Sequence, residues 1–356
     1  MLGSPFTLRC GLTLPNRTAL AALTNWQSHA DGTLADDELN FLVQRAAGGF
    51  GLVCTCAAYV AQDGKAWPGE LGVDRDADLP GLTRLASAIK AHGSVAFAQL
   101  FHGGARAEEN VSGVPTWSAT AWTDPKIATP REGSLADIEH AIANFAAAAK
   151  RVQTAGFDGV ELHGAHGYLL SQFLSRTMNT RRDGWGDDLA GRARLTRETV
   201  RAVRAACGPA FAIGVRLSME DFGNAKGQDL DDNLQVARWL VEDGVDFLHA
   251  SLWDHTRPSV KRPEHHVITE LRAVVPKEVA IQAAGKIWTH AEGEAVLAQG
   301  ADIVALGRSA ILNPTWPRLA EDAIRKPPMT RADLAERAVS KTFQDYLTNW
   351  KNFVAD

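Results

Sequence analysis

The sequence lacks the features that mark secreted, disulfide-stapled or membrane-spanning proteins. Its 356 residues include only four cysteines, Cys10, Cys54, Cys56 and Cys207, and no pair has zinc-finger spacing. Four scattered thiols favour a reducing cytosol. No apolar run reaches the roughly 18 residues that a membrane helix needs, and residues 1–17 have neither the charged segment nor the long apolar segment of a signal peptide. We therefore expect a cytoplasmic protein.

A strong excess of charge is also missing. The chain carries 37 lysines and arginines against 42 aspartates and glutamates, which gives a formal net charge of -5. This balance predicts no basic surface for nucleic acid or anionic lipid. With 45% hydrophobic residues the chain can bury a core that needs no disulfide bonds or metal ions to hold it together. Its length suits either two domains or one α/β barrel.

Short apolar runs alternate with longer segments of helical period from Thr18 to about Lys326. The runs mostly do not alternate with polar residues, which is typical of strands covered on both faces. Segments 155–163, 243–251 and 299–307 repeat one pattern of helix end, glycine, aspartate and apolar strand. This alternation favours a parallel (β/α)8 barrel, predicted as a single domain over residues 1–328. The predicted strands are residues 18–23, 51–55, 95–100, 159–162, 211–217, 247–251, 279–283 and 303–306.

The segments between the strands carry helix signals. Apolar residues recur every three or four positions over residues 138–152, which predicts one amphipathic helix. Capping-box spacing at residues 134–137 and 289–292 marks two helix starts. Residues 329–356 are predicted to form a C-terminal extension of one or two helices, packed on the barrel or on a neighbouring subunit. Further helices are predicted over residues 36–47, 79–92, 192–206, 230–242, 264–275 and 314–326.

Polar, glycine-rich or aromatic segments follow the predicted strands. Because chemistry in such barrels takes place at the carboxyl ends of the strands, we expect these segments to share one face. In strand order the residues are Thr24 and Trp26, Ala57, Gln99 and Phe101, His163, His166 and Tyr168, Arg216, Ser251, Gly285 and Lys286, and Gly307 and Arg308. The glycine-plus-cation turns after the seventh and eighth strands predict a phosphate site, since glycine lets backbone N–H groups approach an anion.

These strand-end segments resemble the old yellow enzyme family, and the resemblance covers nearly the whole chain. Its most specific stretch is HGAHGYLLSQFLSRTMNTRRDGWGDDLAGRARL at residues 163–195, followed by QLFHGGAR at 99–106, GVRLS at 214–218 and ADIVALGRSAILNPTWP at 301–317. LTNWQSH near the first strand and the NPTWP ending look more like the thermophilic-like bacterial branch. The resemblance implies non-covalent FMN, reduced by NADPH or NADH, which passes hydride to an activated alkene or a quinone.

The resemblance also implies a role for each candidate residue. His163 and His166 would hold a carbonyl or nitro oxygen above the flavin, and Tyr168 would protonate the alkene carbon next to the activating group. The residues implied in cofactor binding are Ala22, Leu23, Thr24, Ala57, Gln99, His163, Arg216 and Ser251 around the flavin ring, and Gly285, Lys286, Gly307 and Arg308 around the phosphate. Trp26 and Phe101 would line the substrate pocket together with Tyr168.

The chain departs from the family pattern in several places. The family usually has proline early in the turn after the first strand, where this chain has AALT at residues 21–24, so that turn is expected to differ in shape. Branch relatives often have cysteine at the Thr24 position. Tryptophan is common at the Phe101 position, so the smaller ring is expected to widen the pocket. No clustered cysteine motif follows the barrel, so no iron–sulfur cluster is predicted. FAD is not expected, because no G-x-G-x-x-G unit follows the first strand.

Several alternatives stay open on the residues themselves. His163 and His166 have a chelating spacing, but no third ligand obviously completes a zinc site, so no metal is predicted. Trp26 and Phe101 could equally be ordinary core residues. The same flavin pocket would suit an enzyme that isomerises or demethylates its substrate, or a flavin-binding protein with little turnover. A metal-dependent barrel hydrolase is a further alternative. The sequence distinguishes neither NADPH from NADH nor a monomer from a homo-oligomer.

Overall fold

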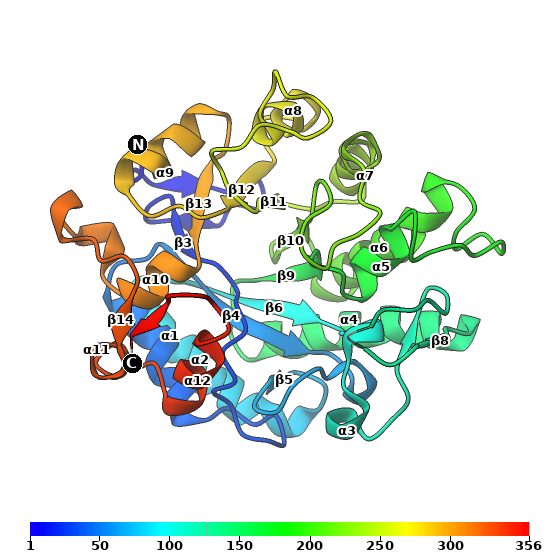
Figure 1. Cartoon of the computed structure of the whole chain (residues 1–356), viewed down its shortest axis with the longest axis horizontal. Helices are drawn as coiled ribbons and strands as arrows, with labels where there is room; N and C mark the ends of the chain where they lie inside the picture. The colour runs from blue at the N-terminus through cyan, green and yellow to red at the C-terminus, as the bar shows by residue number, and fades with distance from the viewer. Residues whose placement is uncertain (126, 356) are drawn as a thin grey trace.

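Eight parallel strands form a closed barrel in the computed structural model, which describes residues 1–125 and 127–355 (Figure 1). The strands are β3 (Thr18–Leu20), β4 (Leu52–Tyr59), β6 (Val95–Phe101), β9 (Gly159–Gly164), β10 (Ala212–Leu217), β11 (Phe247–Ser251), β12 (Ala280–Ala284) and β13 (Ile303–Leu306). Each pairs with its neighbour in chain order, and the pairings of β3 with β13 and with β4 close the ring. The barrel predicted from the sequence is confirmed.

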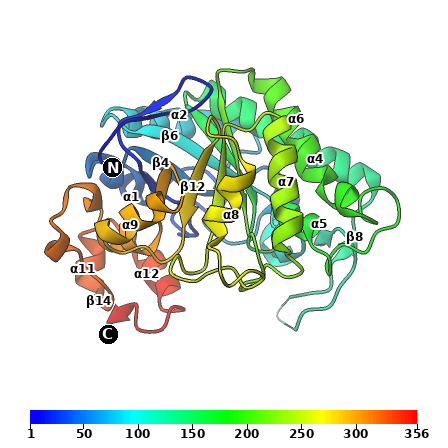
Figure 2. The same cartoon turned by 90° about the horizontal axis from the view of Figure 1, so that it is seen from above.

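Helices surround this barrel (Figure 2). The long ones are α1 (Asp36–Ala47), α2 (Leu79–Lys90), α4 (Leu135–Thr154), α6 (Leu189–Cys207), α7 (Leu230–Glu242), α8 (Val267–Val274) and α9 (His290–Ala298). The shorter ones are α3 (Glu109–Ser112), α5 (Leu169–Leu174), α10 (Arg308–Leu312), α11 (Arg331–Ala335) and α12 (Lys341–Leu347). Both predicted capping boxes are present, at the starts of α4 and α9. No helix among the described residues is long and apolar enough to cross a membrane.

Two segments differ from their predicted secondary structure. The helix predicted over residues 314–326 is wrong: only two 3₁₀ turns form there, Trp316–Arg318 and Glu321–Ala323. Proline interrupts the segment because its ring removes a backbone donor, and the Asn313 side chain bonds both the N–H and the carbonyl of Arg325. The first strand ends at Leu20 instead of residue 23, which leaves the next residues as irregular backbone.

The amino end of the barrel is filled with apolar side chains. Phe97 and Phe247 meet in its interior with ring centroids 5.6 Å apart. A Cβ atom at Gly214 would lie 2.2 Å from the Phe247 ring, so this strand position needs a glycine. The hairpin of β1 (Phe6–Thr7) and β2 (Thr13–Leu14) packs over this end, on the opposite side of the molecule from the C-terminal helices (Figure 2). The amino end is therefore closed.

The C-terminal segment packs against α1 and the end of the barrel. Phe343 on α12 is fully buried and meets Phe41 of α1 edge to face, with ring centroids 5.5 Å apart. The buried guanidinium of Arg45 donates hydrogen bonds to the carbonyls of Ala310, Ile311 and Arg337, and so ties α1 to both α10 and the tail. Strands β14 (Met329–Thr330) and β15 (Val354–Ala355) pair with each other.

Truncating Phe343 tests whether the tail is part of the folded unit. We expect Phe343→Ala to lower the free energy of unfolding by about 3–5 kcal/mol, because it leaves a cavity beside Phe41. Chemical denaturation of the holoenzyme measures this loss. Lys341→Ala on the exposed side of the same helix is the matched control, with an expected change within about 0.5 kcal/mol. Equal small effects of both variants would mean that the tail is only loosely attached.

Candidate active site

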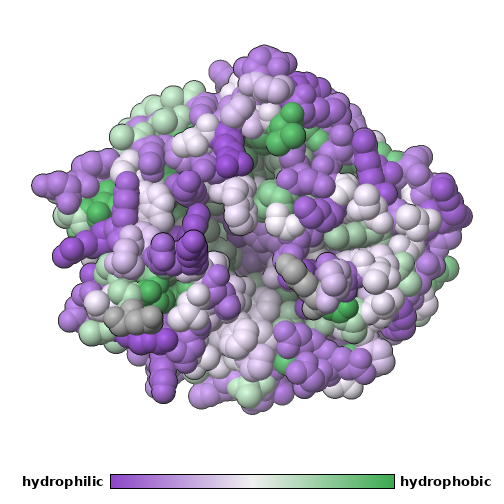
Figure 3. All heavy atoms as spheres, in the orientation of Figure 1, coloured by the Kyte–Doolittle hydropathy of each residue, from purple (hydrophilic) through white to green (hydrophobic). Residues whose placement is uncertain are grey.

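The carboxyl ends of the strands surround a cavity of about 630 Å³. On the face seen in Figure 1 the surface is hollowed near its centre, with mainly hydrophilic side chains around the recess (Figure 3). Among the described residues no aspartate or glutamate lines the cavity. Of the residues proposed from the sequence, the lining contains Ala22, Leu23, Thr24, Ala57, Gln99, His163, His166, Tyr168, Arg216, Ser251, Gly285, Lys286, Gly307 and Arg308.

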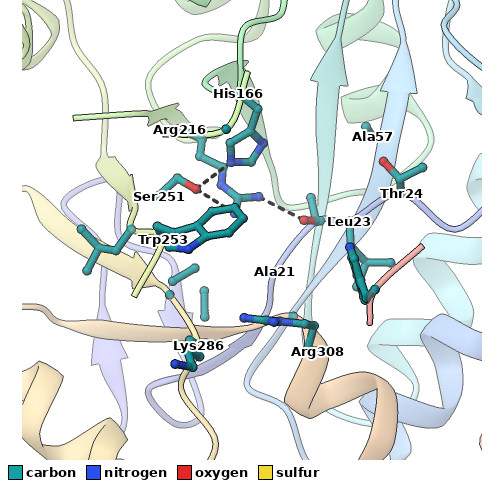
Figure 4. Close-up of a pocket in the computed structure, with 18 of the residues that line it drawn as sticks. Ala21, Leu23, Thr24, Ala57, His166, Arg216, Ser251, Trp253, Lys286 and Arg308 are labelled. Atoms are coloured by element: carbon teal, nitrogen blue, oxygen red, sulfur yellow. Dashed lines mark hydrogen bonds between the residues drawn. The ribbon is translucent and has the colours of Figure 1, made fainter. Parts of the chain in front are cut away.

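Arg216 is held at the floor of the cavity with one edge of its guanidinium in use. Nη1 donates to the carbonyl of Ala22 at 3.0 Å, and Nη2 donates to Oγ of Ser251 at 3.2 Å (Figure 4). Nε is buried and has no partner among the described residues. A buried N–H without a partner is costly, so this atom marks a position where a ligand acceptor fits.

His163 lies near the end of β9 and His166 in the turn that follows it, and their rings converge. Their ring centroids lie 4.9 Å apart with nearly perpendicular planes, and Nε2 of His166 is 2.7 Å from Oγ of Ser251. Residue 166 has a left-handed φ of 61°, and a Cβ atom at Gly167 would lie 2.3 Å from the carbonyl oxygen of Asn224. Burial, with the nearby Arg216 charge, lowers the pKa of His163 to about 3 and that of His166 well below its usual value. Both imidazoles are therefore neutral at pH 7.

Tyr168 stands next to the histidine pair. Its ring centroid is 5.0 Å from that of His163, and the guanidinium carbon of Arg106 lies 5.6 Å from the Tyr168 ring centroid. Burial raises the pKa of Tyr168 to about 12, although Arg106 acts in the opposite direction. The side chain is therefore a protonated phenol at neutral pH, able to donate to a ligand in the cavity.

Two residues expected to line the substrate pocket do not line the cavity. Phe101 is fully buried behind Tyr168, which it meets edge to face at a centroid distance of 4.5 Å. Trp26 has a left-handed φ of 56°, and its ring lies against Tyr346 of the tail at 5.6 Å. Both side chains thus support residues that face the cavity.

Other aromatic residues line the cavity and were not identified from the sequence. They are Trp67, Phe222, Trp253, Trp288, Tyr346 and Trp350. Trp253 follows β11 by two residues, so the strand-end rule could have found it. Its side chain is 63% exposed, with a ring centroid 5.9 Å from that of Phe222. Tyr346 and Trp350 belong to an apolar stripe of residues 343–353 in the C-terminal extension, and the spacing of this stripe indicates only helix packing.

The cavity extends to the turns after β12 and β13. Arg308 is the first residue of α10, and its side chain makes no hydrogen bond or ion pair with any described residue and points into the cavity (Figure 4). Lys286 instead places Nζ 3.0 Å from a carboxylate oxygen of Asp254, and its side chain is more than half exposed. A Cβ atom at Gly307 would meet no atom within 4 Å, so the backbone there faces open space. A free guanidinium beside exposed backbone at a helix start suits a phosphate group.

Comparison with known proteins identifies the cofactor for which this cavity is built. The family model for NADH:flavin oxidoreductases and NADH oxidases, an FMN family, matches residues 2–326. The chain belongs to this family. It is an NAD(P)H-dependent flavin oxidoreductase, and the unpaired Nε of Arg216 and the free Arg308 fit the polar ring edge and the phosphate of FMN.

Relatives and solved structures agree with this assignment. The chain is 34% identical to an NADPH dehydrogenase of Bacillus licheniformis, over 90% of this chain and 93% of the relative. It is also 34% identical to an NADH:fumarate oxidoreductase of Klebsiella pneumoniae, over 88% of this chain but only 35% of the relative. The old yellow enzyme homologue of Zymomonas mobilis has the same fold, with a TM-score of 0.84, 27% identity, and coverage of 97% of this chain and 99% of that one. The resemblance to old yellow enzymes is confirmed.

Removing the Arg308 guanidinium tests whether this end of the cavity holds the FMN phosphate. A hydrogen bond to a charged group contributes about 1.5–3 kcal/mol, so Arg308→Ala should raise the dissociation constant of FMN roughly 10- to 150-fold. Riboflavin lacks the phosphate and should bind the variant as it binds the parent. Lys286→Ala is the matched control with a smaller effect, because its ammonium already pairs with Asp254. Equal weakening of FMN and riboflavin would contradict a phosphate role for Arg308.

Proposed function

We propose that this enzyme reduces electron-poor alkenes, such as α,β-unsaturated carbonyl and nitro compounds, with Tyr168 as the proton donor. The observation that carries the proposal is the convergence of two neutral imidazoles and one protonated phenol on a single cavity. FMN, when bound, supplies the hydride that it receives from NADPH or NADH. The protein must then hold the alkene, polarise its activating group and deliver one proton.

The histidines are placed to hold the oxygen of the activating group. The backbone N–H of Ala165 donates to Nδ1 of His163, which favours the tautomer with Nε2–H. Arg216 donates to Ser251, so the serine hydroxyl can in turn donate to Nε2 of His166 and leave Nδ1–H free. Two fixed N–H donors of this kind stabilise negative charge that develops on an oxygen.

Tyr168 is placed to complete the reaction. When hydride reaches one alkene carbon, the neighbouring carbon gains carbanion character and needs a proton, which the phenol O–H provides. The tyrosinate left behind would be stabilised by the charge of Arg106 and then reprotonated by solvent. Small electrophilic molecules are therefore the proposed substrates, and Gln99, Thr24, Ser251, Gly285 and Gly307 the proposed cofactor contacts beside the two arginines.

Isotope labelling tests the proposal directly. The holoenzyme is incubated without oxygen with a cyclic enone and NADPH that carries deuterium at the transferred position. We expect a saturated ketone with one deuterium at the β-carbon and one solvent hydrogen at the α-carbon. Isomerised or demethylated product, or no product while a quinone still oxidises the enzyme, would contradict alkene reduction.

A further inference from the structure

Four polar side chains form a layer across the inside of the barrel, just below the cavity. Gln99 is paired in register with Glu161, and His249 with Gln282. None of the four is more than 2% exposed. We call Gln99, Glu161, His249 and Gln282 the polar layer. Phe97 and Phe247 lie two positions before Gln99 and His249 on the same strands, and their aromatic rings fill the barrel interior there. Packing therefore does not require polar groups in the barrel interior.

Glu161 is the centre of the polar layer. Nε2 of Gln99 donates to one carboxylate oxygen at 2.6 Å, and Nδ1 of His249 lies 2.7 Å from the other. Nε2 of Gln282 lies 3.1 Å from the same imidazole nitrogen, whose hydrogen points to the carboxylate because a carboxylate can only accept. Because Gln99 uses its N–H group on Glu161, its carbonyl oxygen remains free of described partners, on a residue that lines the cavity.

The polar layer carries one net negative charge. Burial raises the pKa of Glu161, but the hydrogen bonds from His249 and Gln99 and the charge of Arg216 act in the opposite direction and keep the carboxyl group ionised. Burial lowers the pKa of His249, so this imidazole is neutral and donates its Nδ1–H to the carboxylate. Arg216 is paired in register with His249. The ionised carboxylate of Glu161 thus lies below the permanently charged guanidinium of Arg216. Such a buried charge is costly unless it has partners.

We propose that Glu161 is a positioning residue that sets the reduction potential of the bound flavin. It fixes the Gln99 amide with an acceptor toward the cavity, and its negative charge opposes that of Arg216. Arg216 favours negative charge on the reduced cofactor, and Glu161 limits this preference. The inference rests on FMN occupying the cavity; it does not depend on which compound reoxidises the enzyme.

Replacing the carboxylate by its neutral isostere tests the proposal. Glu161→Gln removes one negative charge but keeps an acceptor for His249. Reduced FMN, which gains negative charge, should then bind about tenfold more tightly relative to oxidised FMN, since one charge in the protein interior alters such an equilibrium strongly. For a two-electron couple, tenfold is about 30 mV toward more positive potentials. Titration against a reference dye measures the shift without NADPH or alkene.

Two further variants separate charge from packing. Glu161→Asp keeps the charge and should keep the potential close to that of the parent. His249→Asn replaces one neutral group by another and should change the binding ratio less than threefold, although it disturbs the same layer. Equal shifts in Glu161→Gln and His249→Asn, or an equal shift in Glu161→Asp, would overturn the proposal.

A second variant, in which all four side chains of the polar layer are amides, guards against misfolding. If Glu161→Gln does not fold, Glu161→Gln with His249→Gln replaces it, because amides can satisfy one another across the layer. The same tenfold change is expected, and an unchanged potential would overturn the proposal. Failure of alkene reduction in the parent enzyme would leave these potentials measurable, so the two proposals fail separately.

Discussion

Replacing Tyr168 with phenylalanine should slow alkene reduction by about 10²–10⁴, the usual contribution of a general acid. Hydride transfer from NADPH to the flavin needs no proton from this side chain, so that half-reaction should stay within a few-fold of the parent. The two rates are measured separately by stopped-flow absorbance. Quinones, which acquire no carbon-bound proton, should be reduced at nearly the parental rate. The pKa of Tyr168 is raised to about 12, so the parent enzyme always has this proton available at neutral pH. Phenylalanine has no such proton, which is why the variant should be slow.

Arg106→Met is the companion variant for the proton donor. It removes the cation near the Tyr168 ring while the phenol stays in place. We expect alkene reduction to slow less than in Tyr168→Phe, since the tyrosinate loses only a stabilising charge. Equal slowing of both half-reactions by Tyr168→Phe would instead mean that the tyrosine positions ligands, and the acid would have to be water or another group.

The parts of the site that follow one another along the chain could be predicted from the sequence. His163 lies at the end of β9, and His166 and Tyr168 follow within five residues, so a strand that ends in HGAHGY is enough to place them together. The position of Gly285, Lys286, Gly307 and Arg308 at the cavity could be predicted for the same reason, since each pair directly follows a strand. The barrel itself follows from strand–helix alternation, which depends only on local pattern.

The remaining parts depend on contacts between distant segments. Trp26 and Phe101 lie at or just beyond the ends of strands, yet the Trp26 ring packs against Tyr346 of the tail and the Phe101 ring packs against Tyr168. The apolar stripe of residues 343–353 does not indicate that Tyr346 faces the cavity. Tyr346 is separated from the first strand of the barrel by more than three hundred residues of chain. The helix predicted over residues 314–326 does not form because Pro314 and Pro317 lack backbone donors and the Asn313 side chain binds the backbone of Arg325.

The polar layer did leave a signal in the sequence. Gln99, Glu161, His249 and Gln282 each interrupt an otherwise apolar strand, at a position that alternation assigns to the barrel interior. A single interruption is easily taken as noise, whereas four of them on four strands indicate a common depth. Their pairing could be predicted only with the strand register, which the structure provides.

A phenol bound in the cavity should report directly on the two histidines. Phenolates held over FMN give a long-wavelength charge-transfer band, and two positioned N–H donors would stabilise the bound oxyanion by a few kcal/mol. We expect His163→Ala with His166→Ala to abolish the band and to weaken phenol binding about 10²-fold or more, while FMN stays bound. His92→Ala, at an exposed position, is the matched control. Persistence of the band in the double variant would show that the histidines do not hold the anion.

The pH dependence of the same band distinguishes neutral donors from cations. With the pKa of His163 lowered to about 3 by burial, the imidazole is already neutral at pH 5 and undergoes no change between pH 5 and 8. Phenol binding as the anion should therefore strengthen steadily as pH rises toward the phenol's own pKa of about 10. Were the histidines cations with an ordinary pKa near 6.5, affinity would instead level off or fall above about pH 6.5 as they lost their charge. Absorbance titrations at several pH values decide between these outcomes, and a loss of affinity above neutrality would contradict the neutral pair.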